Sequence, residues 1–142
     1  MTLKACAKNF AMVDRLSLVT NDGFRLATTR YSAQGPLKGN LIMAGATGVQ
    51  QRFYRRFAEH ASQRGFNVLT VDYRGIGESR PKSLKGFEMS YLDWGFRDLA
   101  AAVDFMDDGC TPVYWIGHSF GGHALGLLPN HHKSTAAYCF GT

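Results

Sequence analysis

Cysteine is scarce in this sequence, and its spacing excludes two common structural uses. The chain has three cysteines, Cys6, Cys110 and Cys139, an odd number without a Cys-x-x-Cys pair. A disulfide framework needs paired cysteines, and a structural zinc site needs closely spaced ligands. The adjacent His131 and His132 have no Cys, Asp or Glu within ligand spacing. We therefore expect reduced thiols, no metal and no cofactor.

Long hydrophobic runs are also missing. The longest apolar stretch extends from Leu41 to Val49, whereas a membrane-spanning helix needs about 20 apolar residues. The N-terminal segment has no apolar core of the length that a secretion signal requires. The sequence predicts a soluble, cytoplasmic protein without a membrane partner.

Nucleotide-binding and nucleic-acid-binding patterns are incomplete. Gly75 and Gly77 lack the third glycine of a G-x-G-x-x-G motif, and no Gly-Lys-Ser/Thr occurs in the chain. The formal net charge is +5, and the tightest basic group is Arg52, Arg55 and Arg56. At helical spacing these arginines would form a solvated face, so we expect no nucleic-acid partner.

The chain does have enough apolar material for one core. Its 142 residues are 45% hydrophobic and 13% aromatic, which excludes a disordered chain and predicts one domain or a large piece of one. Residues 1–13 lack periodicity and are interpreted as an N-terminal tail, whereas residues 14–142 form the folded unit.

Strand patterns recur along the folded unit. Residues 14–33 alternate in polarity around Asn21-Asp22-Gly23, which predicts an antiparallel hairpin. Further strands are expected within residues 39–48, where the strand ends in a loop, and at residues 66–72, 113–116 and 134–140.

Helical patterns lie between these strands. Phe53, Phe57, Ala58 and Ala61 repeat at helical spacing, which predicts a helix with its aromatic side chains inward and its end at Gly65. A second helix should begin near a Ser90 and Asp93 capping pair and present one apolar stripe, and a short third helix is expected at 122–128. The members of the stripe are Leu92, Phe96, Leu99, Val103 and Met106. The alternation of strands and helices predicts an α/β fold with a mostly parallel sheet.

A glycine-framed serine lies where a strand should turn into a helix. In an α/β sheet the loops after parallel strands share one rim, where ligands bind. Ser119 lies on that rim in a Gly-x-Ser-x-Gly pattern with Gly117 and Gly121, whose missing side chains would allow a strand and a helix to approach closely. The pattern predicts a strained serine with its hydroxyl raised above the sheet.

The chain resembles the α/β-hydrolase superfamily, and more closely its predicted serine hydrolases of the serine-aminopeptidase-like or esterase-like branch. The resemblance rests on four segments in the family's order and spacing, "AGATGVQQRFYRRFAEHASQRGF", "VLTVDYRGIGESRP", "YLDWGFRDLAAAVDFM" and "YWIGHSFGGHALGLLPN", and covers the chain from Asp14 onward. It implies the α/β-hydrolase fold and hydrolysis of a small acyl ester, thioester or amide through an acyl-enzyme on Ser119.

The resemblance also implies an oxyanion hole made of two backbone N–H groups. One donor would be Phe120, and the other would be Ala46 or, less favoured, Thr47. Many relatives have His-Gly in the latter loop, where this chain has Ala44-Gly45.

The family places its acid and its histidine after the serine, whereas this sequence ends at Thr142, one strand beyond it. Residues 14–142 are therefore expected to form the N-terminal half of the domain, truncated after about the sixth strand. The exposed sheet edge would permit self-association. The alternative function is a non-catalytic binding module or an inactive truncated gene product.

No residue within the chain is a convincing substitute for the missing pair. We expect His118 to be structural, His123 to border the pocket and His60 to lie far from the rim. Asp72 and Glu78 are expected to brace the loop around Arg74 rather than to act as the triad acid.

Overall fold

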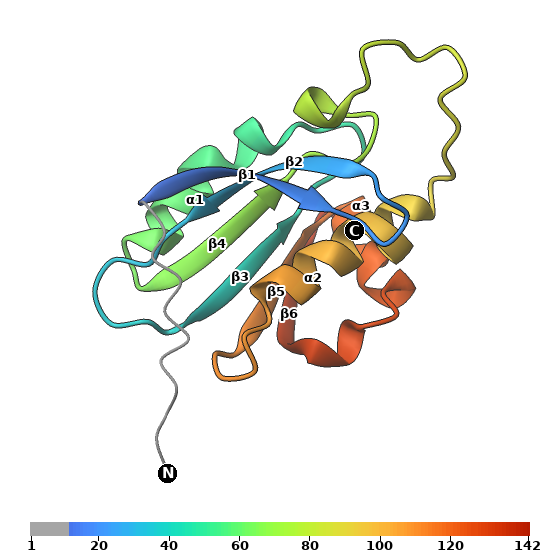
Figure 1. Cartoon of the computed structure of the whole chain (residues 1–142). Helices are drawn as coiled ribbons and strands as arrows, with labels where there is room; N and C mark the ends of the chain where they lie inside the picture. Colours follow the sequence, from blue (N-terminus) through green and yellow to red (C-terminus); the bar gives the residue numbers. More distant parts are fainter. Residues whose placement is uncertain (1–11) are drawn as a thin grey trace.

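A mixed six-stranded sheet forms the centre of the structure, a computed structural model in which residues 12–142 are described (Figure 1). The strand order is β1-β2-β4-β3-β5-β6, with β1 and β2 antiparallel and β4, β3, β5 and β6 parallel. The strands are β1 (Val13–Val19), β2 (Arg25–Tyr31), β3 (Gly39–Ala44), β4 (Phe66–Val71), β5 (Val113–His118) and β6 (Ser134–Phe140). This arrangement confirms the expected α/β class and its opening hairpin.

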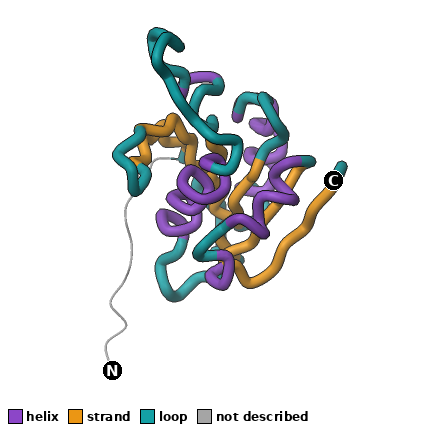
Figure 2. The backbone as a smooth tube through the Cα atoms, turned by 90° about the vertical axis from the view of Figure 1, so that its right-hand side faces the viewer, coloured by secondary structure: helices purple, strands orange, loops and turns teal. Residues whose placement is uncertain are grey.

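Helices cover the two faces of the sheet (Figures 1 and 2). A 3-10 turn, η1 (Gln51–Tyr54), leads into α1 (Arg55–Ser62) on one face. The other face carries the π-helical turn η3 (Trp94–Leu99), α2 (Ala100–Met106) and α3 (Phe120–Ala124). Three short 3-10 turns complete the set, η2 (Gly77–Ser79), η4 (Leu125–Leu127) and η5 (His131–Lys133). No helix within residues 12–142 is long and apolar enough to cross a bilayer.

The inward aromatic face expected for the first helix is confirmed for Tyr54 but is wrong for Phe53 and Phe57. Phe53 and Phe57 are 69% and 38% exposed, whereas Tyr54, Ala58 and Ala61 are buried. The 3-10 turn η1 has 3.0 residues per turn, so it shifts the phase of the buried stripe relative to a continuous α-helix. As a result the stripe starts at Tyr54.

The second helix differs from its expected stripe for a related reason. The capping pair is present, since the Ser90 N–H donates to Asp93 Oδ2 at 2.8 Å. Leu92 and Phe96, however, are 47% and 45% exposed. The π-helical turn η3 contains an extra residue per turn, which rotates Trp94 inward instead.

The third helix begins earlier than expected. It starts at Phe120, directly after Ser119, rather than at residue 122. The strand β5 therefore passes into α3 through a single residue.

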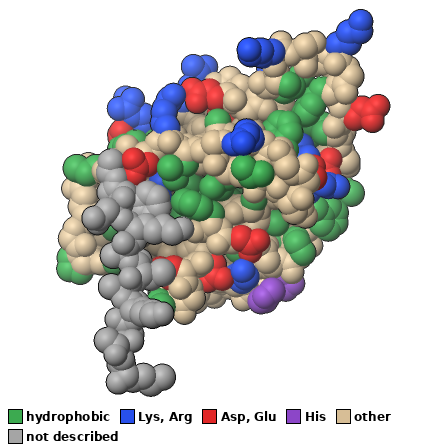
Figure 3. All heavy atoms as spheres, in the orientation of Figure 1, with side chains coloured by type: hydrophobic (Ala, Val, Ile, Leu, Met, Phe, Trp, Pro, Cys, Tyr) green, Lys and Arg blue, Asp and Glu red, His purple; other side chains and the backbone are tan. Residues whose placement is uncertain are grey.

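The strand β6 lies at a free edge of the sheet (Figure 2). From Thr135 onward each of its residues is exposed. A shallow apolar groove of about 370 Å³ lies beside it, with Tyr114, Ile116 and Tyr138 among its lining residues. On the face of the molecule that Figure 3 shows, acidic side chains lie among the basic ones.

Candidate active site

Ser119 has a strained backbone at the carboxyl end of β5. Its φ is 51° and its ψ is −116°, and it is the only non-glycine residue with positive φ among residues 12–142. The turn is held by the Gly122 N–H, which donates to the Ser119 carbonyl at 2.9 Å, and by the Ser119 N–H, which donates to the Phe140 carbonyl at 2.9 Å. A non-glycine residue persists in such a conformation only where its surroundings enforce it.

The two flanking glycines are required by close packing. A Cβ atom on Gly117 would lie 2.6 Å from the Gly122 Cα, and one on Gly121 would lie 1.9 Å from the Ala44 carbonyl oxygen. Any larger residue would separate α3 from β5 and β3. The strand, the serine turn and the helix thus have the arrangement that the sequence pattern predicts.

The loop after β3 reaches the same rim, and tyrosine hydroxyls hold it. The Ala46 N–H donates to Tyr54 Oη at 2.8 Å, and Tyr73 Oη donates to the Gly45 carbonyl at 2.8 Å. The Thr47 hydroxyl is hydrogen-bonded to Tyr91 Oη. The Ala46 N–H is thus already engaged in this structure.

Two other backbone donors near this rim are unengaged. Neither the Phe120 N–H nor the Thr47 N–H donates a hydrogen bond within the described part of the chain. The first N–H groups of a helix have no partner inside the helix, which explains why the Phe120 N–H is unpaired.

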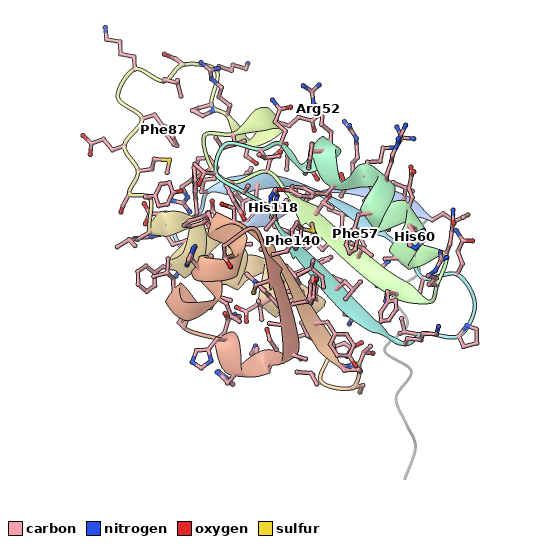
Figure 4. The ribbon with its side chains drawn as sticks, turned by 180° about the vertical axis from the view of Figure 1, so that it is seen from behind. Arg52, Phe57, His60, Phe87, His118 and Phe140 are labelled. Carbon is pink, nitrogen blue, oxygen red and sulfur yellow. The ribbon has the colours of Figure 1, made fainter. Side chains whose placement is uncertain are left out.

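His118 belongs to a structural network and not to a pair with Ser119. Its Nδ1 atom lies 2.9 Å from Tyr54 Oη, and its ring stacks on Phe140 at 4.7 Å between centroids (Figure 4). Phe53 stacks on the ring at 6.5 Å. These contacts agree with the structural role expected for His118.

An aromatic cluster surrounds Phe120 on the other side of the serine turn. The Phe120 ring lies 4.6 Å from Tyr91, 5.5 Å from Trp94 and 6.0 Å from Tyr73, between ring centroids. Tyr91 is brought there by the long excursion of residues 80–92, which stands away from the sheet and carries Phe87 (Figures 1 and 4). Sequence reasoning missed Tyr73 and Tyr91, because no motif marks them.

The acidic side chains near this rim support the loop that follows β4 and carries Arg74. Asp72 accepts hydrogen bonds from the Gln51 and Glu78 N–H groups at 2.7 and 3.0 Å. The Glu78 carboxylate pairs with Arg15 at 3.1 Å. Asp72 therefore braces the loop that carries Arg74, as expected, and Glu78 ties the same loop to β1.

The Arg74 side chain itself is held by two other carboxylates. Its guanidinium contacts Asp98 and Asp22, each at 2.8 Å. Burial raises the pKa of Asp98 to about 6, although Arg74 opposes the shift. The hydrogen bond from Arg74 holds the pKa of the Asp22 carboxyl well below its usual range.

The remaining histidines do not approach Ser119 through a hydrogen bond. His123 is exposed on α3, and His60 lies on α1, where Arg64 contacts its ring at 3.1 Å. The Ser119 hydroxyl makes no hydrogen bond within residues 12–142. No three His, Cys, Asp or Glu side chains gather as a metal site in the same residues.

Comparisons with known proteins support the fold. The model of the alpha/beta hydrolase family matches residues 41–139. No curated protein sequence matches the chain at a significant level.

Several solved structures share the fold at low sequence identity. They include a thermostable carboxyl esterase from Bacillus coagulans (TM-score 0.73, 16% identity), which matches 94% of this chain and 45% of its own. A cold-adapted esterase from an Arctic intertidal metagenomic library (TM-score 0.65, 19% identity) matches 98% of this chain and 65% of its own. An epoxide hydrolase from Vigna radiata (TM-score 0.64, 20% identity) matches 90% of this chain and 39% of its own. The chain thus spans less than two thirds of the length of each.

Proposed function

Because the chain belongs to the alpha/beta hydrolase family, we propose that it carries the nucleophile half of a serine hydrolase. In this proposal Ser119 attacks the carbonyl carbon of an ester, thioester or amide, and the leaving group departs to give an acyl-enzyme that water hydrolyses. The observation that carries the proposal is the strained backbone of Ser119 at the head of β5, with φ of 51°.

The turn also offers a donor for the developing oxyanion. The Phe120 N–H is the first of α3 and has no partner within residues 12–142. A second N–H from the loop Gly45–Gly48 completes the proposed oxyanion hole, with Ala46 as the residue implied by the family resemblance and Thr47 as the alternative. Ala46 can serve only if Tyr54 Oη releases its N–H.

The base and the acid are proposed to come from outside residues 1–142. A serine hydroxyl is a weak nucleophile until a base removes its proton, and no described histidine is hydrogen-bonded to Ser119. We therefore expect this chain alone to be at least about 10⁴-fold slower in kcat than a version that carries the later strands.

A fluorophosphonate probe tests the proposal directly. The longer version should be labelled at Ser119, as located by mass spectrometry, and should hydrolyse an aryl ester. Ser119→Ala should abolish both, whereas Ser17→Ala, at an exposed position on β1, should change neither. Labelling that survives Ser119→Ala would reject Ser119 as the nucleophile.

The second candidate is a binding module that keeps the fold without the chemistry. The observation in its favour is the unpartnered Ser119 hydroxyl within residues 12–142. The fold does not decide between the two, since esterases and an epoxide hydrolase share it. A longer version that is folded but is neither labelled nor active would favour the binding module.

A further inference from the structure

We infer that Tyr54 and Tyr73 clamp the Gly45–Ala46 peptide from its two ends, so that Thr47 supplies the N–H that this loop offers to an oxyanion. The inference rests on the proposed function for its catalytic meaning, and Tyr54 and Tyr73 are positioning residues in it. It moves the loop donor one residue beyond the position that the family resemblance implies.

The clamp follows from the chemistry of a single peptide unit. The carbonyl of Gly45 and the N–H of Ala46 belong to the same planar group. Tyr73 Oη donates to the carbonyl at 2.8 Å, and the N–H donates to Tyr54 Oη at 2.8 Å. Any rotation of this peptide would break both bonds and leave polar groups unpaired in a buried place.

Tyr54 is itself held in one orientation. Its oxygen accepts from the Ala46 N–H and also lies 2.9 Å from His118 Nδ1, so two partners fix the direction of the hydroxyl. A Cβ atom on Gly45 would lie 2.8 Å from Tyr54 Cε2, so only glycine leaves the ring in its place.

Tyr73 approaches the same peptide from the other face of the sheet. It is 2% exposed and belongs to the core on the α2 side. Its ring stacks on Trp94 at 5.2 Å and meets the Phe120 ring edge-on at 6.0 Å. The clamp therefore couples the loop to the residue that follows Ser119.

The clamp determines which backbone N–H of the loop remains free to bind an oxyanion. With the Ala46 N–H engaged, the next backbone donor along the loop without a partner in residues 12–142 is Thr47. Its side chain is fixed by the hydrogen bond to Tyr91 Oη. Thr47 and Phe120 would then form the pair of donors.

Amide hydrogen exchange measured by NMR on the full chain tests the clamp. We expect the Ala46 amide to exchange at least about tenfold more slowly than the Thr47 amide. Tyr54→Phe should raise the Ala46 rate about tenfold, because only the accepting hydroxyl is lost. The matched control is Tyr31→Phe, since Tyr31 is equally buried at 6% exposure and its hydroxyl makes no hydrogen bond within residues 12–142.

The imidazole ¹⁵N spectrum of His118 gives a second readout. Tyr54→Phe should shift its Nδ1 resonance, and Tyr31→Phe should not. An Ala46 amide that exchanges as fast as Thr47 in the wild-type chain would overturn the clamp, as would equal effects of the two variants. Neither readout needs a reactive serine, so Ser119→Ala should leave both unchanged.

The donor assignment has its own test in the longer, labelled protein. The phosphonyl oxygen on Ser119 should shift the Thr47 and Phe120 amide protons downfield and leave Ala46 in place. A shift at Ala46 instead of Thr47 would overturn the assignment. Absence of labelling would reject the proposed function while the exchange data still decide the clamp.

Discussion

At the scale of single residues, Ser119 stores energy in its backbone. A non-glycine residue with φ of 51° and ψ of −116° lies outside the regions that side chains tolerate. Such conformations cost about 1–3 kcal/mol and persist where the surrounding structure enforces them. Here the Ser119 N–H and carbonyl are both held by hydrogen bonds, and Gly117 and Gly121 let α3 pack closely enough to make them.

This strain predicts an unusual order of stability among variants. Ser119→Gly and Ser119→Ala both remove the hydroxyl, but only glycine adopts this φ without strain. We expect the glycine variant to be more stable than the alanine variant by about 1 kcal/mol in urea unfolding. Equal stabilities, or a more stable alanine variant, would show that the turn is relaxed.

The sequence was sufficient to locate Ser119 but not the tyrosines around it. The glycine requirement is local, because the turn and its flanking residues are consecutive, so a five-residue pattern can report it. Tyr54 meets Ala46 and His118 only because β3, η1 and β5 converge. That convergence depends on sheet order, which no short pattern encodes.

At the scale of elements, the π-helical turn η3 decides how the second helix packs. The extra residue in the turn brings Gly95 against Leu127, where a Cβ atom would lie 2.7 Å from the Leu127 Cβ. The same turn exposes Leu92 and Phe96. Burial here follows the π geometry rather than an α-helical stripe.

Two glycine-to-alanine variants test this packing. Gly95→Ala should destabilise the fold by about 1–3 kcal/mol, because the new methyl group overlaps Leu127. Gly126→Ala is the matched control, since nothing lies within 4 Å of its added Cβ, and it should be neutral or slightly stabilising. Equal unfolding free energies for the two variants would contradict the close contact.

Strands were more predictable than helix faces for a physical reason. A half-buried strand keeps a period of two whatever follows it, and a strand buried on both faces is a continuous apolar run, so the hairpin and β4 were correctly predicted. Helix phase changes when a 3-10 or π turn is inserted, as at η1 and η3. Those turns form through tertiary contacts and leave no clear periodicity in the sequence.

Three elements meet at Arg74, which bridges Asp22 of the hairpin turn and Asp98 of η3. The pKa values of the two carboxyl groups are shifted in opposite directions. Asp98 has a native pKa raised to about 6 from 3.8 by burial, so its contribution to stability is full below about pH 4 and is lost as the pH rises through 6. Asp22 has a lowered pKa, so its contribution is present above about pH 4 and is lost as the pH falls.

Comparison of the wild-type chain with Asp98→Asn isolates the first of these effects. Between pH 4 and pH 7 the unfolding free energy of the wild type, relative to the variant, should fall by about 2 kcal/mol. Urea unfolding at unit steps of pH measures this difference. A relative stability that rises over the same range would contradict the raised pKa of Asp98.

At the scale of the whole molecule, the two edges of the sheet differ in how well they are protected against pairing with another chain. The edge strand β1 carries Asp14 and Arg15, whereas β6 has no charged residue and no proline. Charged side chains on an edge discourage pairing with another chain. Tyr138 is 67% exposed on β6, beside the apolar groove.

The unprotected edge predicts self-association of the 142-residue chain. Sedimentation velocity should show concentration-dependent association at tens of micromolar, and Tyr138→Lys should reduce it by placing a charge on β6. Val19→Lys, at an exposed position on β1, adds the same charge elsewhere and should leave association unchanged. A monomeric wild-type chain over this range would contradict the prediction.

The strand order also determines when each strand finds its neighbours during synthesis of the chain. The central strand β3 lies between β4 and β5, and its pairing with β5 joins Asn40 to Val113. A ribosome therefore completes β3 and synthesises about 70 further residues before the second neighbour of β3 exists. Until then β3, which is buried along its whole length in the finished sheet, has one unpaired side, and pairing over such a sequence distance is slow. During synthesis the central strand β3 therefore waits longer for its full set of neighbours than the edge strands do.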